Sequence, residues 1–564
     1  MIWTVVRNSI KFQMEYWLTL CYPSDTKEIA CNMDKLLIEL AEEVIGQEIP
    51  CKGGENEDAV GIDIPVAGIN GKSIQKWLTE MPVRQGGMGL ESQEGLRGAA
   101  FIGGMEMALP FFRGENGICP PLGHLIEEDP QTRYRNLIES GCRRGQELSE
   151  SWNSIRREAM EVKDYLGEEE ILVELQVGAE GAGGGSTDGS TRKVLIKARQ
   201  DWRNRALTKA IEEHKEQNHR AISTWRDRDK LTSAFWLAGP GHGTDIEPQE
   251  FAEGAASYLC LPSRVCKDRV GERVGKSLVD RHGERVLLEP LPGGHWTERH
   301  DTMAQEVASL CHYAGIPAER EPFGLFGHLI PQEALSRIQQ NQTSQVLRPD
   351  IRMEIARRKS TIHTTETSAP AASPGDIVGP TIAEIKFVTK GAKAHYSLGA
   401  GRQRAVDKRA GMIPQEYRGK AARMDRESGA EFEGPCQRRL AEFKLLRLVW
   451  GALGEGSEDV HSLVTVLAES RVRTLGLRGE KPGPHQLGLE VSLIRRRLSV
   501  AAVRANSNCL LSRVSQIGEG SGMAAKRREL QRQEERNMMM QEESERIARL
   551  TGQEVVKRGM FWCG

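Results

Sequence analysis

Two acidic residues and one lysine near the middle of the chain have the types and the spacing of a metal-dependent hydrolytic site. Asp350 lies in the segment 347–351 (Leu-Arg-Pro-Asp-Ile), and Glu384 and Lys386 lie in 381–388 (Thr-Ile-Ala-Glu-Ile-Lys-Phe-Val). Both segments are short, apolar and rich in β-forming residues, so each predicts a strand. Glu384 and Lys386 are two positions apart, and on a strand their side chains therefore project from the same face.

These residue types suit the hydrolysis of a phosphodiester. The carboxylates of Asp350 and Glu384 are hard oxygen ligands for Mg²⁺ or Mn²⁺, and such an ion polarises a phosphoryl oxygen and lowers the pKa of bound water. The Lys386 ammonium can orient the attacking water or stabilise the developing negative charge. The alternative interpretation is structural, since Glu-x-Lys on a solvent-facing strand is common and Pro-Asp is an ordinary turn signal.

The flanking sequence predicts a helix and two further strands around these residues. Residues 299–314 predict an amphipathic helix, and Gly315 and Pro317 end it. The apolar face of this helix comprises Met303, Val307, Leu310 and Ala314. Residues 319–323 predict a first strand at the edge of a sheet, and residues 445–453 predict a fourth strand. Asp350 then falls on the second strand, and Glu384 and Lys386 fall on the third.

The placement of Pro349-Asp350 and Glu384-x-Lys386 on successive strands resembles the PD-(D/E)xK nuclease superfamily. The resemblance implies a restriction-endonuclease-like α/β core, a mixed sheet flanked by helices, that runs helix, three strands, helix, strand within residues 290–475. It also implies that Asp350 and Glu384 bind the metal and that both act with Lys386 in catalysis. The separation between the two acids is longer than the superfamily usually shows. The excess is the Ser-, Thr-, Pro- and Ala-rich segment 360–380, which predicts a solvated insertion.

A second resemblance covers roughly residues 75–510 and concerns the order of several landmarks. Residues 81–90 (Met-Pro-Val-Arg-Gln-Gly-Gly-Met-Gly-Leu) are similar to the LP-x-R-x-GG-x-G segment that follows the reverse-transcriptase thumb in non-long-terminal-repeat retrotransposons with a restriction-enzyme-like endonuclease. The later landmarks, in the family's order, are Ala99-Ala100-Phe101-Ile102-Gly103, His282-Gly283, Arg299-His300-Asp301 and Arg348-Pro349-Asp350. The resemblance implies an endonuclease that nicks target DNA, with DNA and element RNA as partners.

The chain departs from that family in two ways. It contains no Tyr-x-Asp-Asp motif, so no reverse-transcriptase active site is expected. The family also places a zinc knuckle before the endonuclease, but only Cys260, Cys266 and His282 fall in that window, whereas structural zinc takes four ligands. We therefore expect a degraded knuckle without zinc. The alternative to an active nuclease is a decayed, non-enzymatic nucleic-acid-binding or scaffold fragment of a mobile element.

Four further residues are supporting candidates for the site. The resemblance implies that Arg299 and His300, at the start of the helix before the sheet, contact substrate or support the metal site. Glu306 and Glu321 are candidates for a third carboxylate that faces the metal. The alternative for this helix start is structural, because an acidic residue such as Asp301 is favourable near the positive end of the helix dipole.

Basic residues concentrate in 402–426, after the predicted third strand. The formal net charge of the chain is −2, so any attraction to nucleic acid must be local. Pro414 can begin a helix here, and its basic side chains together with Tyr417 can meet phosphates. A solvated helix face is the alternative interpretation. The candidate nucleic-acid-binding residues are Arg402, Arg404, Lys408, Arg409, Arg418, Lys420 and Arg423.

Composition and patterning predict an α+β protein that is mostly helical. With 564 residues, of which 38% are apolar and 28% charged, the chain is expected to divide into several domains. The expected divisions are a helical segment (1–75), a post-polymerase helical region similar to a thumb or connection (76–177), a Gly-rich linker (178–191), a helical region with the degraded knuckle (192–289), the endonuclease-like domain (290–475), a helical extension (476–520) and a charged helical or disordered tail (521–564).

The cysteines and the hydropathy indicate the cellular environment. The 11 cysteines occur singly without a paired framework, which favours a reducing compartment. The chain opens with no secretory signal pattern, and no apolar run approaches the roughly 18 residues of a membrane span. We therefore expect an intracellular protein of the nucleus or cytoplasm that contacts no membrane, and the sequence does not indicate its oligomeric state.

Overall fold

The computed structural model describes most of the chain between residues 11 and 517. Residues 53–70, 114–137, 169–189, 214–219, 335–346, 356–378, 389–401 and 478–482 are outside the description, as are positions 240, 242, 292, 323, 332, 431–432 and 484. Almost all of the expected Gly-rich linker and of the insertion at 360–380, and the whole expected tail, therefore lie outside the described residues.

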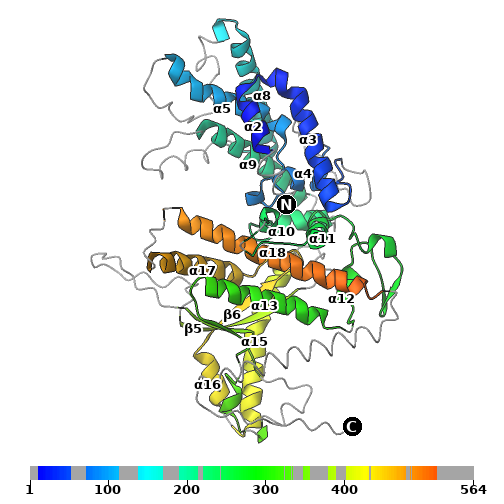
Figure 1. Cartoon of the computed structure of the whole chain (residues 1–564), viewed down its shortest axis with the longest axis vertical. Helices are drawn as coiled ribbons and strands as arrows, with labels where there is room; N and C mark the ends of the chain where they lie inside the picture. Colours follow the sequence, from blue (N-terminus) through cyan, green and yellow to red (C-terminus); the bar gives the residue numbers. More distant parts are fainter. Residues whose placement is uncertain are drawn as a thin grey trace, which may run out of the picture.

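The first half of the chain is helical (Figure 1). Its helices are α2 (Lys11–Leu20), α3 (Pro23–Ile45), α4 (Ile74–Glu80), α5 (Gln93–Arg113), α8 (Arg143–Leu166), α9 (Ser190–Glu213) and α10 (Arg220–Asp227), with short 3-10 turns η2 (Val83–Gln85) and η4 (Ala234–Leu237). A large apolar core joins α3, α4, α5, α8, α9 and α10, and the three tryptophans Trp202, Trp225 and Trp236 are buried in it. The buried residues of α2, Met14 and Leu18, belong to a smaller cluster with Ala30, Leu96 and Ala100.

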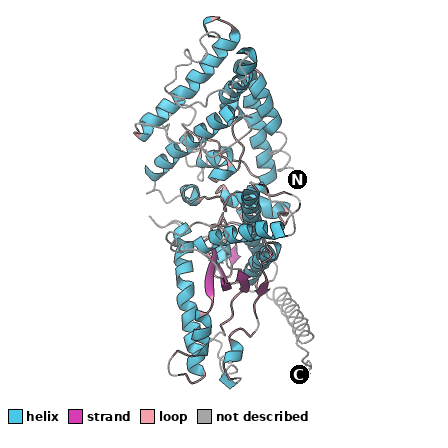
Figure 2. Ribbon diagram, turned by 90° about the vertical axis from the view of Figure 1, so that its left-hand side faces the viewer, coloured by secondary structure: helices cyan, strands magenta, loops and turns pink. Residues whose placement is uncertain are grey.

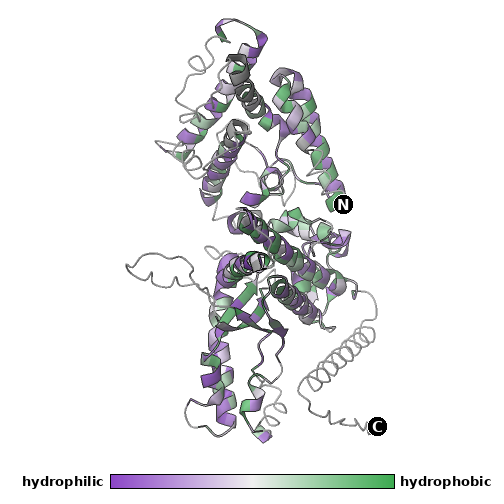
Figure 3. Cartoon of the chain, turned by 60° about the vertical axis from the view of Figure 1, so that its left-hand side comes forward, coloured by the Kyte–Doolittle hydropathy of each residue, from purple (hydrophilic) through white to green (hydrophobic). Residues whose placement is uncertain are grey.

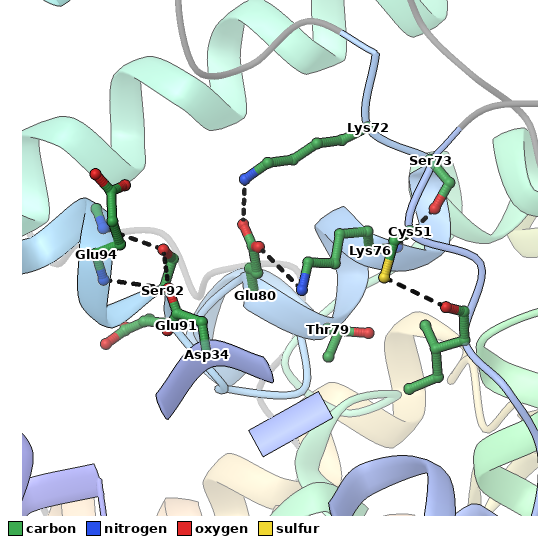
Figure 4. Close-up of polar contacts among 12 residues, drawn as sticks. Asp34, Cys51, Lys72, Ser73, Lys76, Thr79, Glu80, Glu91, Ser92 and Glu94 are labelled. Carbon is green, nitrogen blue, oxygen red and sulfur yellow. Dashed lines mark hydrogen bonds and ion pairs between the residues drawn. The ribbon is translucent and has the colours of Figure 1, made fainter. Parts of the chain in front are cut away.

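Buried ion pairs and a helix cap hold α4 and α5 in place (Figure 4). Glu80, at the end of α4, lies 2.9 Å from the Lys72 Nζ atom and 3.5 Å from Lys76 Nζ. Burial by itself would raise the pKa of Glu80, but the charges of the two lysines outweigh it and lower the pKa. Asp34 of α3 accepts hydrogen bonds from Ser92 Oγ at 2.7 Å and from the backbone N–H of Gln93 at 2.6 Å, so it satisfies the free amide groups at the start of α5.

The segment that resembles the retrotransposon motif forms a tight turn between α4 and α5. Gly86 and Gly89 have φ angles of 88° and 87°, a conformation that glycine adopts without steric cost. A Cβ atom on Gly87 would lie 2.1 Å from the carbonyl oxygen of Met81. The hydroxyl of Tyr258 donates to the Gly86 carbonyl at 2.6 Å. Positive φ angles therefore account for the glycines at 86 and 89, and close backbone approach accounts for Gly87.

The second half of the chain combines helices with two small sheets. Its elements are α11 (Pro248–Tyr258), β1 (Arg273–Val274), β2 (Ser277–Leu278), α12 (Glu284–Leu288), α13 (His295–Tyr313), β3 (Ala318–Arg320), β4 (Ile351–Ile355), β5 (Gly379–Phe387), α15 (Arg402–Glu427), α16 (Pro435–Ala441), β6 (Lys444–Trp450), α17 (Glu458–Leu477) and α18 (Gln486–Val514), with 3-10 turns η5 (Lys267–Arg269) and η6 (Gly327–Leu329). The described chain is thus mostly helical with a small mixed sheet, as expected for an α+β protein.

The larger sheet has four strands in the order β3-β4-β5-β6. β3 pairs antiparallel with β4, and β4 pairs antiparallel with β5, with Ile351 opposite Ala383. β5 and β6 are parallel, because α15 and α16 carry the chain back between them. Figure 2 shows these strands in magenta, flanked by helices. The described elements therefore run helix, three strands, two helices, strand from α13 to β6.

The two faces of the sheet bury different helices. On one face Ala383 and Ile385 pack against α13, α17 and α18. On the other face Ile382 and Val449 pack against α15. Each of these helices carries hydrophilic and hydrophobic residues (Figure 3), as expected for helices with one buried side. Because side chains alternate along a strand, Glu384 lies on the same face as Ile382, toward α15.

Several predicted elements occur with shifted ends. β3 ends at Arg320, before Pro322, and β6 spans Lys444–Trp450. α13 begins four positions before Arg299, at His295, and its predicted apolar face is buried. Pro414 lies inside α15 rather than at the start of a helix, so that expectation was wrong. Buried residues on both sides of the proline, from Val406 to Met424, continue the helix, because tertiary packing can outweigh the roughly 3 kcal/mol cost of an interior proline.

The state of the cysteines and the hydropathy of the helices bear on the expected compartment and on membrane contact. The described cysteines form no disulfide. Within the described ranges, every helix is too short or too polar to cross a lipid bilayer.

The turn at 81–90 gives a test of the fold. Gly87→Ala should lower the free energy of unfolding by about 1–3 kcal/mol, the usual cost of over-packing, because the new methyl group would overlap the Met81 carbonyl. The control is Gly411→Ala on the exposed side of α15, where the new Cβ meets open space; it should stabilise the helix by up to about 1 kcal/mol. Thermal and urea unfolding followed by circular dichroism measure both. Equal stability of the two variants would contradict the close approach.

Candidate functional site

Asp350 and Glu384 lie side by side at the end of the β4–β5 ladder. Asp350 immediately precedes β4 rather than lying within it, yet its backbone N–H still donates to the Ala383 carbonyl at 3.0 Å. Its carboxylate atom Oδ2 accepts from the backbone N–H of Ile385 at 2.5 Å. Because Ile351 pairs with Ala383, the same antiparallel register sets Asp350 opposite Glu384. The two acids therefore share one face of the sheet.

Glu384 is held by two side chains on that face. The Lys386 Nζ atom lies 2.5 Å from Glu384 Oε1, and the hydroxyl of Tyr417 on α15 donates to the other oxygen, Oε2. Glu384 is only 4% exposed and Tyr417 only 1%, whereas the side chain of Lys386 is 33% exposed. The site thus pairs a buried carboxylate with an ammonium that reaches solvent.

His300 binds the second acid from the start of α13. Its Nε2 atom lies 3.0 Å from Asp350 Oδ2, and its Nδ1 atom lies 3.2 Å from Asp301 Oδ1. Burial by itself would lower the pKa of His300, but the hydrogen bonds and negative charges of the two aspartates outweigh it and raise the pKa to about 9. At neutral pH this side chain is therefore an imidazolium ion.

The charges at the site shift the ionisation of Glu384 and Tyr417. Burial and the neighbouring Asp350 charge raise the pKa of Glu384, although Lys386 and Tyr417 act in the opposite direction. Burial and the Glu384 carboxylate raise the pKa of Tyr417 well above its ordinary value. Tyr417 therefore stays a neutral hydrogen-bond donor, while Lys386 and His300 supply positive charge beside the two acids.

The other supporting candidates do not join this cluster. Glu306 faces α18, where Arg497 Nε lies 2.6 Å from its carboxylate, because six positions along α13 turn it by about 240° from His300. Glu321 is half-buried, and its carboxylate pairs with Arg348 at 2.8 Å. Neither is the third metal-facing carboxylate that we expected.

Arg299 is buried on the far side of the sheet end. Its guanidinium lies 4.7 Å from the centre of the Phe387 ring, and its Nη1 atom lies 3.4 Å from Asn506 Oδ1. Burial lowers the pKa of Arg299. Its role in these contacts is to pack α13 against β5 and α18, not to reach substrate.

Metal ligands are sparse in the described part of the chain. Within those residues, no three His, Cys, Asp or Glu side chains are grouped around one possible ion position. In the segment where we expected a degraded knuckle, Cys260 Sγ contacts Thr224 Oγ1 at 3.0 Å, and His282 Nδ1 lies 3.2 Å from the Leu261 carbonyl. Cys266 is fully buried.

The basic tract divides into buried, site-facing and outer residues. Arg402 is 5% exposed and its Nε atom lies 2.5 Å from Glu455, so it cannot contact nucleic acid, contrary to our expectation. Arg409 forms an ion pair with Glu416. The pKa of Glu416 is lowered, most by Arg409 and less by the charges of Lys386 and Lys420. Glu416 therefore lies within electrostatic reach of Lys386 at the candidate site. The exposed basic residues of the tract are Arg404, Lys408, Arg418, Arg423 and Arg426.

The sequence reasoning missed the role of Tyr417, which it placed among phosphate contacts. A signal was present, because Ala410, Ile413, Tyr417 and Ala421 recur at helical spacing and share one face. That pattern puts Tyr417 on the buried side of the helix. The sheet beneath it then brings Glu384 within reach.

Comparisons with known proteins add no assignment. No protein-family model matches this chain, and no curated protein matches it either. Any argument about function therefore stands on the arrangement of the residues themselves.

The titration of His300 tests the local electrostatics. The protein is labelled at the histidine Cε1 carbon, and the NMR signal of His300 is identified as the one that is absent from His300→Gln. This signal should titrate near pH 9. In Asp350→Asn the pKa of His300 should move toward the ordinary histidine value of about 6.5. Because the folded-state pKa is raised, the stability that His300 contributes is complete below the unfolded pKa and is lost as the pH rises through about 9. A midpoint near 6.5 in the unmodified protein would exclude the contact with Asp350.

The burial of Arg402 gives a second test. Arg402→Met would leave Glu455 fully buried and Asp227 nearly so without this countercharge, and loss of one partner of a buried pair typically costs about 3–5 kcal/mol. Lys408→Met, on the exposed side of the same helix, should change stability by less than about 0.5 kcal/mol. Chemical unfolding of both variants measures the difference. If Arg402→Met unfolds like the parent and only binds DNA less tightly, Arg402 is a surface residue.

Proposed function

We propose that this chain is a retrotransposon-derived, Mg²⁺-dependent endonuclease that nicks DNA by hydrolysis of a phosphodiester. The observation that carries the proposal is the β4–β5 register, which sets Asp350 beside Glu384 with Lys386 Nζ 2.5 Å from the glutamate. The order of elements from α13 to β6 supports a PD-(D/E)xK-like core, since it matches the order that the sequence resemblance implies except for a second helix, α16, before the last strand. DNA is the proposed substrate, and element RNA is a further proposed partner.

The residues present fit a Mg²⁺ ion. Mg²⁺ takes oxygen ligands and is commonly bound through one or two carboxylates, with waters and substrate phosphates as its other ligands. Asp350 and Glu384 would hold the ion, so the lack of a third acidic ligand among the described residues is compatible with this donor set. When bound, such an ion polarises the phosphoryl oxygen and lowers the pKa of the attacking water.

The protein's own groups suit the binding of a phosphodiester. The ammonium of Lys386, one-third exposed, attracts the phosphate and stabilises the negative charge that grows during attack. The imidazolium of His300 adds a second positive charge on the Asp350 side. Arg409, which pairs with Glu416, and Lys420 are further cationic residues of α15, and we propose that they contact neighbouring phosphates of the strand.

One observation favours the alternative, a non-enzymatic nucleic-acid-binding or scaffold fragment with a decayed core. Both oxygens of Glu384 and one oxygen of Asp350 already have partners within the protein. A network satisfied in this way can hold the end of a sheet without any metal. Under this alternative the protein binds DNA without cutting it.

Nicking of supercoiled plasmid by the full chain in Mg²⁺ distinguishes the two functions. Lys386→Ala should lower the nicking rate by roughly 10²–10³-fold, as for the loss of one charge-stabilising group, and Asp350→Ala should lower it at least as much. The matched control is Glu354→Ala, because Glu354 lies on β4, four positions after Asp350, and is exposed. All variants should still bind DNA, measured by fluorescence anisotropy in Ca²⁺.

Two results would contradict the proposed endonuclease. Equal nicking by the parent chain and both site variants would show that another site cuts the plasmid. Tight DNA binding by a parent chain that nicks no faster than Asp350→Ala would leave the non-enzymatic alternative.

A further inference from the structure

We infer that Tyr417 is a positioning residue, whose phenol fixes one oxygen of Glu384 so that the other oxygen can exchange Lys386 for a divalent cation. This inference rests on the proposed endonuclease function, and it assigns a role within that site. It concerns the hydrogen bond from the Tyr417 hydroxyl to Glu384 Oε2 and the ion pair of Lys386 with Glu384 Oε1.

The two partners of Glu384 differ in freedom of movement. Tyr417 is 1% exposed and packs among Ile382, Ile413 and Val449 in the core between α15 and the sheet. Close packing leaves such a ring one position. Lys386 is one-third exposed, and its long side chain can turn into solvent. The tyrosine contact is therefore fixed, whereas the lysine contact is exchangeable.

The two partners also differ in charge. A divalent cation that approaches the carboxylate repels the Lys386 ammonium, and the ammonium can leave toward solvent or toward an incoming phosphate. The phenol of Tyr417 is neutral, so a cation does not repel it. With Oε2 held by Tyr417, Oε1 is the Glu384 oxygen that becomes available, on the same strand face as Lys386.

Both ends of α15 are anchored, which keeps Tyr417 in register with Glu384. At the start of the helix, the backbone N–H of Arg402 donates to Asp227 Oδ2 at 2.6 Å. Near its end, the Asp425 carboxylate accepts from the backbone N–H of Cys436 at 2.8 Å, at the start of α16. The helix therefore cannot slide along the sheet without breaking buried hydrogen bonds.

A purely structural role for Tyr417 predicts something different. A buried tyrosine hydroxyl usually finds an acceptor, and loss of such a hydrogen bond changes stability without changing metal affinity. A positioning residue acts through Glu384, so its loss weakens metal binding even where the fold is intact. Outer contacts that orient a metal ligand typically contribute about 10–100-fold in affinity.

The test compares Tyr417→Phe with the parent chain and with Tyr313→Phe. Tyr313 is a matched control, because its hydroxyl also donates to a glutamate, Glu490, at 2.8 Å, but on α13 and α18 away from the site. Mn²⁺ binding to the full chain is measured from the electron paramagnetic resonance signal of free Mn²⁺, and Asp350→Ala identifies ions bound at the site. Nicking is measured over a range of Mg²⁺ concentrations.

We expect Tyr417→Phe to bind site Mn²⁺ roughly 10–100-fold more weakly than the parent. The Mg²⁺ concentration for half-maximal nicking should rise by the same factor, while the rate at saturating Mg²⁺ approaches that of the parent. Tyr313→Phe should behave like the parent in both measurements. All comparisons are made below the unfolding transitions of the variants, so a loss of stability cannot imitate a loss of affinity.

The possible failures are distinguishable. If the parent binds site Mn²⁺ and nicks DNA, but Tyr417→Phe has unchanged affinity, the positioning role is overturned and the proposed function stands. If the parent neither binds Mn²⁺ at the site nor nicks DNA, the proposed function and the role of Tyr417 are both overturned.

Discussion

Antiparallel pairing of β4 with β5 sets Ile351 opposite Ala383, and the same register carries Asp350 to the side of Glu384. A slip of one residue would move every side chain of one strand to the other face of the sheet. The pairing is well defined because Ile351, Ala383 and Ile385 are all fully buried against α13, α17 and α18. The apolar core on one face of the sheet thus fixes where the polar groups on the opposite face meet.

Two neighbouring carboxylates at a buried sheet end need compensation, since like charges repel strongly where water is excluded. Each compensating group comes from a different element, with His300 on α13, Lys386 on β5 itself and Tyr417 on α15. The site therefore exists only when helices from both faces are docked on the sheet. This dependence couples the candidate chemistry to the complete C-terminal fold.

Some basic residues of the described chain are buried in ion pairs and others are exposed, a difference that their sequence does not show. Arg402 joins α15 to Asp227 of α10 and to Glu455 after β6, so it links the helical half of the chain to the sheet. Arg497 fixes α18 to α13 through Glu306. Such buried pairs need good geometry to offset the cost of desolvating two charges. On α15, by contrast, Arg404, Lys408, Arg418, Arg423 and Arg426 are exposed to solvent.

The sequence by itself determined the strand that carries Glu384 and Lys386, the strand that begins directly after Asp350, and the buried face of α13, because residue spacing fixes the direction of each side chain relative to its own backbone. It also indicated that Glu384 and Lys386 share a face. Only the tertiary structure decided that His300 and Tyr417 contact the two acids, that Glu306 turns toward Arg497, and that Arg402 is buried. Those outcomes depend on how helices distant in sequence dock on the two faces of the sheet, and that docking is set by the burial of apolar surface across the whole domain.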